Sequence, residues 1–424
     1  MKILIVSWFF PPYNAIGAVR VGKFAKFLHE LGHEVRVISG RDQPLEASLP
    51  VELPEAHVLR TPWINFNAPA ELALGGRAQV KAHGFEPRGP LRQVMSVART
   101  LYKDLLNLPD AQIGWTPFAV LQGTRWLGDF RPDVIFASAQ PVTSLIVGAA
   151  LSRRLGVPWV ADLRDLLDDP VYYTYSPWRR QLDGPLIDRL VSTASTVVTV
   201  SEPLREIIAA RWGLPTELVL NGFDPADFPA GVEVPRGDGR LHLVHTGTLN
   251  GDKRDPRPLF EALASMGPAA DAVRVHFYGR GTELARRVSE ELQLGDIVVM
   301  HGAVPYAEAL RAQASADLNL LILHNHPSEK GIFTGKLFEY LGARRPILAL
   351  GPPDAAACAL IAERRAGLVL NDPAEIATHL RMWVAARADH GPMPPLDDTV
   401  SLGLTRLEQT RVLEGVLRRV AAPR

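Results

Sequence analysis

LVLNGFDPADFPAGVEVPRGDGRLHLVHTG, residues 218–247, is the stretch that decides the fold. Upstream of it, short runs of β-branched residues alternate with longer amphipathic runs, a pattern typical of a parallel sheet with crossover helices. The pattern stops in a segment rich in proline and glycine, as expected of a linker. It starts again at LHLVHTG, residues 241–247. The sequence therefore predicts an α/β protein made of two successive Rossmann-like domains.

The predicted elements follow from the spacing of apolar residues along the chain. We expect an N-terminal domain over 1–221, a linker over 222–240, a C-terminal domain over 241–395 and a final segment over 396–424. Residues 401–420 have the pattern of an amphipathic helix, which we expect to cross back to the first domain. The expected strands are 2–8, 34–40, 133–138, 158–163, 196–201, 241–247, 273–279, 296–302, 316–323 and 346–351, and the expected helices include 21–31, 143–155, 203–212, 256–265, 282–292 and 305–314.

The bulk composition excludes several classes of protein. The chain has 424 residues, 47% of them hydrophobic and 22% charged, which is a globular composition. Lys+Arg and Asp+Glu both number 46, so a chain-wide nucleic-acid-binding surface is not expected. Cys358 is the single cysteine, which excludes an intramolecular disulfide and fits a reducing cytosol. The apolar N-terminal run ends at Pro11 and Pro12 and reads as a first buried strand rather than a signal peptide.

The loops after the strands are the places where we expect a ligand, in a cleft between the two domains. The first loop, FFPPYNAIGAVR, places Gly17 just before a helix, where backbone N–H groups can meet an anion. The same glycine also suits a plain strand-to-helix turn, and both interpretations remain open. The loop does not contain G-x-G-x-x-G, which argues against a dinucleotide-dependent oxidoreductase.

Two further loops carry lysine and arginine. HTGTLNGDKRDP presents Lys253 and Arg254 after a glycine-rich turn, as in a phosphate site or in a solvated basic turn. In TGKLFEYL, Lys336 stands in the first turn of a helix, where its charge opposes the helix dipole by roughly 0.3–1 kcal/mol.

The spacing around Lys336 is not that of a P-loop, since Gly331 and Gly335 have three residues between them and no hydroxyl residue follows the lysine. We expect Thr334 as N-cap. The buried stripe of the helix would contain Leu337, Phe338 and Leu341. Lys336 and Glu339 would then project together, either as an ion pair or as ligands of a diphosphate and a ribose.

These motifs together resemble the glycosyltransferases of family 4, retaining enzymes of the GT-B fold. The resemblance covers the whole length, and its motifs occur in the family's order. They are SWFFPPYNAIGA, LGHEVRVISG, VTVSEPLREII, LNGFDPADF, HTGTLNGDKRDPRPLFEAL, FYGRG, HGAVP and TGKLFEYLGARRPILA. The resemblance implies two Rossmann-like domains that face each other across a cleft, with the C-terminal helix packed on the N-terminal domain.

The resemblance also implies roles at matching positions. Arg254, or Lys253 beside it, would neutralise the leaving diphosphate together with Lys336, and Gly17 would approach the phosphates from the first domain. Glu339 matches the second glutamate of the family's E-x7-E motif, which binds the donor ribose. The first glutamate position holds Gly331, and Glu329 lies two residues before it. The other donor-binding residues would be Gly247, Thr248, Gly279, Phe333, Thr334 and Gly335.

The acceptor side rests on two loops of the first domain. ASAQPVTS lacks the histidine that many family members carry there, and Ser138 is its candidate residue. WVADLRDLLDD contributes Asp162 to catalysis and Arg164 and Asp165 to the acceptor, with Asp162 and Arg164 facing the cleft. Asp168 and Asp169 are expected on the surface.

No cofactor and no metal are expected, because cationic side chains and a helix dipole can hold the phosphates. A metal site formed by His324, His326 and Glu329 is the alternative that the residues allow, against a plain polar loop.

Residues 77–103 carry six lysines and arginines against one carboxylate, Glu86, and apolar residues at helical spacing over 91–106. Such an element suits an anionic membrane surface or a lipid-diphosphate acceptor, and it also suits a solvated helix face. We expect a cytoplasmic protein with peripheral contact at the inner face of the membrane and no nucleic-acid partner. No apolar run approaches the ~20 residues of a membrane span.

The predicted function is the transfer of a sugar from a nucleotide-diphosphate sugar, with UDP favoured over GDP by resemblance. The acceptor would be a hydroxyl of a lipid-linked, polysaccharide or small-molecule acceptor in cell-surface polysaccharide biosynthesis. Retention of configuration is implied by the resemblance, and the sequence offers no obvious nucleophile for a double displacement. The alternatives are a nucleotide-sugar 2-epimerase of the same fold and a non-catalytic nucleotide-sugar-binding relic.

Overall fold

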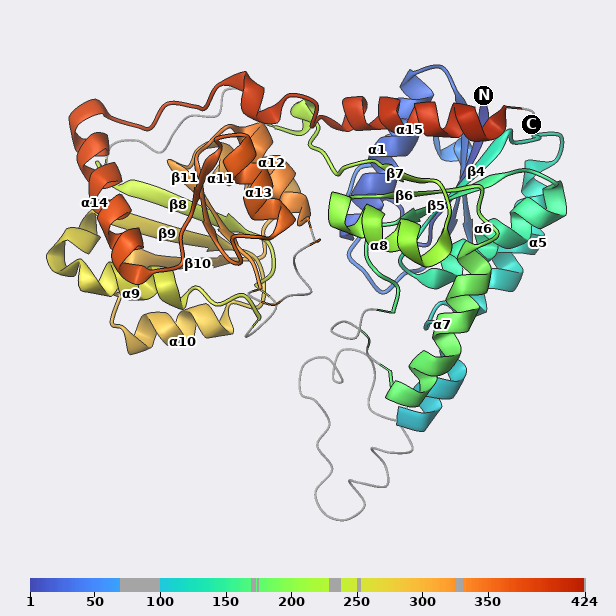
Figure 1. Cartoon of the computed structure of the whole chain (residues 1–424), viewed down its shortest axis with the longest axis horizontal. Coiled ribbons are helices and arrows are strands. Elements are labelled where there is room, and N and C mark those ends of the chain that lie inside the picture. Colours follow the sequence, from blue (N-terminus) through green and yellow to red (C-terminus); the bar gives the residue numbers. More distant parts are fainter. Residues whose placement is uncertain are drawn as a thin grey trace, which may run out of the picture. The chain divides into compact units, whose positions relative to one another are not determined.

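The computed structural model describes residues 1–68, 100–168, 173, 175–228, 238–249, 253–324, 326, 331 and 333–422. Its contacts divide the chain into two compact units. The first contains Met1–Val200, Leu204–Val219 and Thr410–Arg424, and the second contains Ser201–Pro203 and Leu220–Gln409. Each unit is a parallel sheet with helices on both faces (Figure 1), so the predicted α/β class is confirmed.

The first unit is built on a seven-stranded parallel sheet in the order β3-β2-β1-β4-β5-β6-β7. The order reverses next to β1, where Ile3 pairs with Val35 of β2 on one side and with Val134 of β4 on the other. This reversal is the switch point at which ligands bind in open α/β sheets. The strands are β1 (Lys2–Val6), β2 (Glu34–Gly40), β3 (Val58–Thr61), β4 (Val134–Ser138), β5 (Trp159–Leu163), β6 (Thr196–Thr199) and β7 (Thr216–Leu218).

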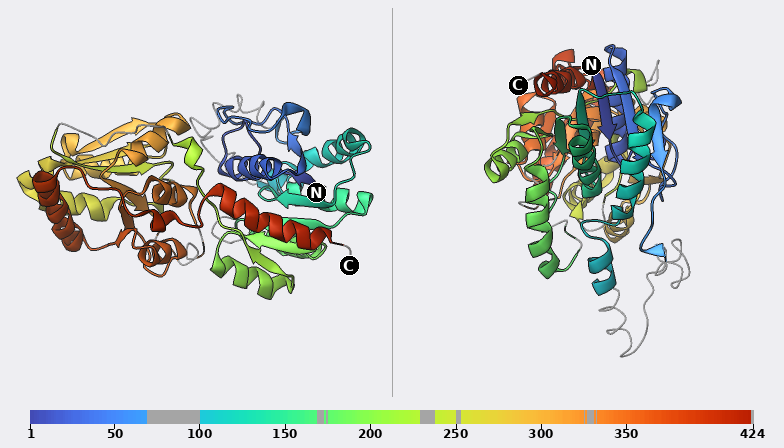
Figure 2. Two further views of the ribbon diagram at one scale, coloured as in Figure 1. Left: turned by 90° about the horizontal axis from the view of Figure 1, so that it is seen from above. Right: turned by 90° about the vertical axis from the view of Figure 1, so that its right-hand side faces the viewer.

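Helices cover both faces of this sheet because its central strands are apolar on both sides. One core contains Leu4 and Leu145, and the other contains Ile3 and Phe24. The C-terminal helix also belongs here, since Leu417 lies in the second of these cores, and Figures 1 and 2 show α15 along the first unit. The helices are α1 (Ile16–Glu30), α5 (Thr116–Leu127), α6 (Val142–Leu155), α7 (Pro177–Val191), α8 (Glu202–Trp212) and α15 (Arg406–Ala421).

The second unit repeats the plan with six parallel strands in the order β10-β9-β8-β11-β12-β13. Helices α9, α10 and α14 pack on one face, and α12 and α13 pack on the other. The strands are β8 (Leu241–Thr246), β9 (Val273–Tyr278), β10 (Val298–Gly302), β11 (Leu318–Ile322), β12 (Ile347–Leu350) and β13 (Gly367–Val369). The helices are α9 (Arg257–Ser265), α10 (Glu283–Glu291), α11 (Tyr306–Ala314), α12 (Gly335–Ala343), α13 (Ala356–Glu363) and α14 (Pro373–His390).

Several elements of the structure are not predicted from the sequence. Helix α7 contains Pro185 and has no clear apolar stripe, so its sequence pattern does not predict a helix. The short edge strands β7 and β13 have three residues each, too few for a periodic signal. Among the described helices, none is both long and apolar enough to cross a membrane. The basic stretch 77–103 falls almost wholly outside the described residues.

A ladder of histidines crosses the second sheet on the face opposite α9 and α10. Nδ1 of His242 lies 2.9 Å from Nε2 of His276, and Nδ1 of His276 lies 3.0 Å from Nε2 of His301. Asp238 ends the ladder, with Oδ1 at 3.1 Å from Nε2 of His242. Burial, followed by the neighbouring His242 and His301, lowers the pKa of His276 to about 4. The folded protein therefore keeps His276 neutral where an unfolded chain would protonate it.

This ladder makes stability depend on pH in a defined direction. As the pH falls from 6.5 towards 4, the unfolded chain gains a proton at residue 276 that the folded chain does not, so folding stability is lost in this window. His276→Asn should remove this contribution. In urea titrations, the parent should therefore lose more of its free energy of unfolding than the variant as the pH falls from about 8 to about 5. Parallel pH profiles for the two proteins would contradict it.

Candidate functional site

In the second unit, two glycines bring the ends of three neighbouring strands together. The Gly247 N–H donates to the Tyr278 carbonyl at 2.7 Å, and the Gly279 N–H donates to the Gly302 carbonyl at 2.7 Å. A Cβ at residue 279 would lie 2.2 Å from the Gly247 oxygen, and Gly247 has φ +91°, so neither position tolerates a side chain. The turn after β8 is therefore bare backbone, with Gly247 and Thr248 exposed to solvent.

Lys336 of α12 lies over this bare turn. A Cβ at Gly247 would be only 3.1 Å from its Nζ, so the glycine gives the ammonium group its space. Nζ lies 3.2 Å from Nε2 of His245, and Nδ1 of His245 lies 2.9 Å from the Leu320 carbonyl. Because a carbonyl only accepts, Nδ1 of His245 carries the proton, and Nε2 accepts from Lys336.

The electrostatics of this group are those of an anion site. Burial, followed by the charge of Arg254, lowers the pKa of Lys336 to about 7, while Glu339 acts in the opposite direction. Burial also lowers the pKa of Arg254, and burial together with Lys336 holds the pKa of His245 well below its usual range. Among the described residues, the Thr248 carbonyl at 2.9 Å is the hydrogen-bond partner of Arg254, so neither cation is neutralised by a carboxylate there.

Glu339 is held in place by two donors from α11. Its Oε1 accepts from the Tyr306 hydroxyl at 3.1 Å, and its Oε2 accepts from Nε2 of Gln313 at 2.9 Å. Gln313 is fully buried and also donates to the Thr246 hydroxyl at 2.9 Å. A carboxylate oxygen has two lone pairs, so Glu339 keeps acceptor capacity for hydroxyl groups of a ligand.

Tyr340 ties helix α12 to the sheet. Its hydroxyl accepts from the Thr246 N–H at 3.0 Å and donates to the Leu320 carbonyl at 3.3 Å, and its side chain is fully buried. One side chain thereby fixes the turn after β8 relative to the helix that carries Lys336. Tyr340 falls among the buried residues of α12, so its position in the sequence predicts a core residue and not a site residue.

The N-terminus of α12 agrees with the expected cap in position. Thr334 precedes the helix with φ −79° and ψ 141°, and Gly335 is the first helical residue. The Thr334 side chain makes no capping bond, and its Oγ1 is buried without a hydrogen-bond partner among the described residues. Phe333 packs edge-on against Phe338 with ring centroids 5.5 Å apart. The first N–H groups of this helix are therefore not satisfied by the threonine side chain.

The predicted donor residues are thus largely brought together. Gly247, Gly279, Arg254, Lys336 and Glu339 all lie around the turn after β8 and the face of α12 next to it. Lys253 is exposed and lies in the loop that precedes α9. Glu329 lies outside the described residues, and Gly331, at the position of the missing glutamate, accepts a hydrogen bond from the Ser201 hydroxyl on its carbonyl.

The first unit holds a second group of predicted residues, at the ends of β4 and β5. The Asp162 carboxylate accepts from the Ser138 hydroxyl at 2.6 Å and from Nη2 of Arg20 at 3.0 Å. Asp162 is fully buried, Ser138 and Arg20 are each 1% exposed, and Arg20 also donates to the Val219 carbonyl at 2.9 Å. The expectation that Asp162 faces an open site is therefore wrong, because its carboxylate is enclosed by these partners. It is a positioning residue that joins α1 to two strands.

Arg164 lies beside this buried pair. Its Nε donates to the Ala139 carbonyl at 2.7 Å, and a Cβ on Gly17 would come within 2.8 Å of its guanidinium. Burial lowers the pKa of Arg164, and the charges of Asp162 and Asp165 oppose this shift. Gly17, at the start of α1, is thus needed for the close approach of Arg164.

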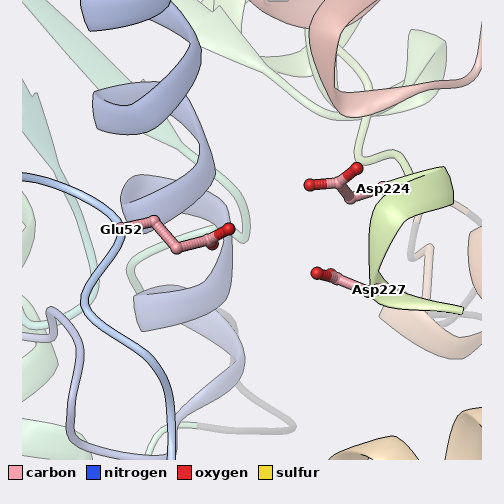
Figure 3. Close-up of side chains that lie close together, drawn as sticks. All are labelled: Glu52, Asp224 and Asp227. Carbon is pink, nitrogen blue, oxygen red and sulfur yellow. The ribbon is translucent and has the colours of Figure 1, made fainter. Parts of the chain in front are cut away.

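Three further carboxylates have protein partners: Asp168 and Glu52 pair with basic side chains, and Asp224 accepts from a backbone N–H. Asp168, expected on the surface, is instead only 13% exposed and pairs with Arg211 at 2.7 Å. Figure 3 shows Asp224 and Asp227 on one short 3-10 helix, where Asp224 accepts from the Ala226 N–H at 3.0 Å. Glu52 in the same picture belongs to the first unit, where Lys23 and Lys26 pair with it.

The structure describes two of the three residues of the alternative metal site in the second unit. The rings of His324 and His326 stack with centroids 5.3 Å apart, and Glu329 is outside the described residues. The prediction that no metal is required stays a prediction.

The sequence over residues 17–222 matches the model of the glycosyl transferase 4-like domain. Residues 17–222 form a glycosyl transferase 4-like domain. The predicted resemblance to family 4-like glycosyltransferases, and the class of enzyme that it implies, are thereby confirmed. A search among curated proteins finds no match to the sequence.

Solved structures share the fold of this glycosyltransferase over nearly its full length. Alr3699/HepE from Anabaena, in complex with UDP, superposes with a TM-score of 0.62 at 16% identity, covering 99% of this chain and 100% of that one. A glycosyltransferase from Rickettsia africae ESF-5 gives 0.61 at 13% identity, covering 100% and 99%. Sucrose-phosphate synthase from Thermosynechococcus elongatus gives 0.57 at 15% identity, covering 99% and 96%. The GT-B fold that the motifs predict is confirmed.

The role of Tyr340 in holding the site can be tested by stability. Tyr340→Phe leaves the Thr246 N–H buried without its acceptor, and such a loss costs about 1–3 kcal/mol. We expect urea titrations to show that the free energy of unfolding of the second unit falls by that amount. Tyr278→Phe is the matched control, because the Tyr278 side chain is half-buried and its hydroxyl bonds to no described residue. Equal stability of the Tyr340 variant and the parent would show that the hydroxyl is not needed.

Proposed function

We propose that this glycosyltransferase transfers a sugar from a UDP-sugar to a hydroxyl group of its acceptor. The observation that carries the proposal is the pair of cations at the turn after β8, Lys336 and Arg254, which lack a carboxylate partner among the described residues. A buried ammonium group with a pKa lowered to about 7 is unfavourable without a counter-ion. A bound diphosphate supplies that counter-ion.

Each part of a nucleotide-sugar finds a matching group in the second unit. The diphosphate suits Lys336, the guanidinium fork of Arg254 and the first N–H groups of α12. The ribose diol suits Glu339, whose carboxylate is already held by Tyr306 and Gln313. Anabaena HepE, which shares the fold, has been solved with UDP and with UDP-glucose, and this supports uridine as the base.

The chemistry follows from the charge that develops on the leaving group. As the bond from sugar to diphosphate breaks, negative charge grows on the phosphate oxygen, and Lys336 and Arg254 stabilise it. These two side chains therefore act as catalytic residues, with no metal required. Asp162 is enclosed by Arg20 and Ser138 and is not poised to attack the sugar, so we propose attack of the acceptor from the face of the leaving group, with retention of configuration.

We further propose that the acceptor is a hydroxyl of a lipid-linked, polysaccharide or small-molecule acceptor in cell-surface polysaccharide biosynthesis. The basic stretch 77–103 supports contact with an anionic membrane from the cytoplasmic side. A 2-epimerase would convert a UDP-sugar without any acceptor, which separates it from a transferase. A non-catalytic relic would not be expected to keep two partly buried cations around an empty turn.

Lys336→Ala tests the donor assignment directly. Removal of a charge-assisted contact worth about 1.5–3 kcal/mol should weaken UDP binding roughly ten- to a hundredfold in calorimetry. Turnover of UDP-sugar should fall further, because the lysine acts most strongly in the transition state. Arg381→Ala, on the exposed side of α14, is the charge-matched control and should bind UDP like the parent. Turnover of the Lys336 variant within a few-fold of the parent would rule out the assignment.

The lowered pKa of Lys336 also predicts how UDP binding depends on pH. In the free protein this group loses its proton as the pH rises through about 7, and bound diphosphate raises its pKa. Binding should therefore take up a proton, and affinity should fall as the pH rises above 7. Calorimetry in two buffers of different ionisation enthalpy measures the uptake. Lys336→Arg, which stays protonated, should abolish both the uptake and the pH slope, and a parent protein without proton uptake would contradict the prediction.

A further inference from the structure

The first unit contains a pocket of 290 Å³ that none of the predicted site residues lines. It lies beside the N-terminus of α6 and against α7. Its apolar lining residues are Phe9, Pro109, Pro141, Val142, Leu167 and Ile187. The volume is at the lower end of the range for small-molecule sites, about 300–1,000 Å³.

The charged groups of the pocket are already satisfied by the protein. The Asp183 carboxylate pairs with Nε of Arg179 at 3.2 Å and accepts from the Tyr173 hydroxyl at 2.6 Å. The Asp110 carboxylate accepts from the Thr143 N–H at 2.8 Å and from the Thr143 hydroxyl. Burial raises the pKa of Asp110, and its hydrogen bonds from Thr143 oppose this shift. A cation in this pocket would find no free counter-charge on these two carboxylates.

Two carboxamides of the pocket, in contrast, are available. The side chains of Gln112 and Gln140 make no hydrogen bond to any residue that the structure describes, although both line the cavity. A carboxamide donates and accepts, as does a hydroxyl group. Two such groups above aliphatic and aromatic walls match a ring that carries hydroxyls at its edge and C–H groups on its face.

The pocket adjoins the acceptor-side residues along the chain. Gln140 and Pro141 directly follow Ser138 and Ala139, and the Ala139 carbonyl is held by Nε of Arg164 at 2.7 Å. The segment that presents Ser138 at the end of β4 therefore continues into the wall of the pocket. A ligand seated there would lie next to the loop that the sequence assigns to the acceptor.

We propose that this pocket binds an uncharged sugar ring of the acceptor, with Gln112 and Gln140 as its specificity-determining residues. The proposal rests on the proposed function, since it names the acceptor class of that transfer. It excludes an acceptor that places a phosphate or a carboxylate at this position, because the described lining residues include no lysine, arginine or histidine to pair with it.

Saturation-transfer NMR with the full chain tests the proposal. The probes are p-nitrophenyl β-D-glucopyranoside and β-D-galactopyranoside, with p-nitrophenyl β-D-glucuronide as the charged comparison. We expect signals from at least one neutral glycoside and none from the glucuronide. Leu167→Trp, which fills the pocket, should abolish the signal, and Gln140→Ala should weaken binding roughly three- to tenfold by loss of one hydrogen bond. Leu121→Trp, on the exposed side of α5 and 51% exposed, is the matched control and should keep the signal.

The outcomes separate this proposal from the donor assignment. A parent protein that binds UDP but neither neutral glycoside overturns the pocket proposal alone, and so does a glycoside signal that Leu167→Trp leaves unchanged. A parent that binds a glycoside but not UDP overturns the donor assignment alone. Because Gln140 is exposed, its alanine variant is expected to fold normally and keeps the test valid if the tryptophan variant does not fold.

Discussion

The hydrogen bond from the ammonium group of Lys336 to the neutral ring of His245 is the interaction on which the second unit's site depends. The ring is fully buried in β8, and its other nitrogen is committed to the Leu320 carbonyl. Only Nε2 is left, and it can accept but not donate. The lysine is thus directed over the bare turn at Gly247, with a partner that positions it but does not cancel its charge.

This arrangement answers the question that the sequence raises about Lys336. A lysine in the first turn of a helix opposes the helix dipole, and an ion pair with Glu339 would have been the plain explanation. In the structure Glu339 is bound by Tyr306 and Gln313 instead, and Lys336 is bound by His245. The two side chains share one face of α12 but have separate supports. Such separate supports are what a site needs if it binds a diphosphate at one residue and a diol at the other.

The parts of this protein that sequence reasoning reached are those with a local signal. Alternating strands and helices and the stripe of Leu337, Phe338 and Leu341 follow from periodicity and composition. The partners of the site residues are different, because they depend on tertiary pairing. His245 reads as one more residue of a buried strand, and Tyr340 reads as one more core residue of a helix. Asp162 shows the opposite error: an acidic residue after a strand suggested an open site, but Arg20, 142 residues away in sequence, encloses it.

The two units use opposite solutions for polar groups, and the difference bears on what each can bind. In the second unit, positive charge is concentrated around Lys336 and Arg254, and no described carboxylate forms an ion pair with either of them. In the first unit, charges are cancelled internally, by Arg20 with Asp162 and by Arg179 with Asp183. Desolvation penalises an unpaired charge far more than a hydrogen-bonded carboxamide, so a pocket lined by paired charges and glutamines favours an uncharged ligand. A transferase that joins a charged donor to a neutral acceptor would need one charged site and one uncharged site. The second unit provides the charged site with its own residues, and the first unit provides the uncharged pocket with its own residues.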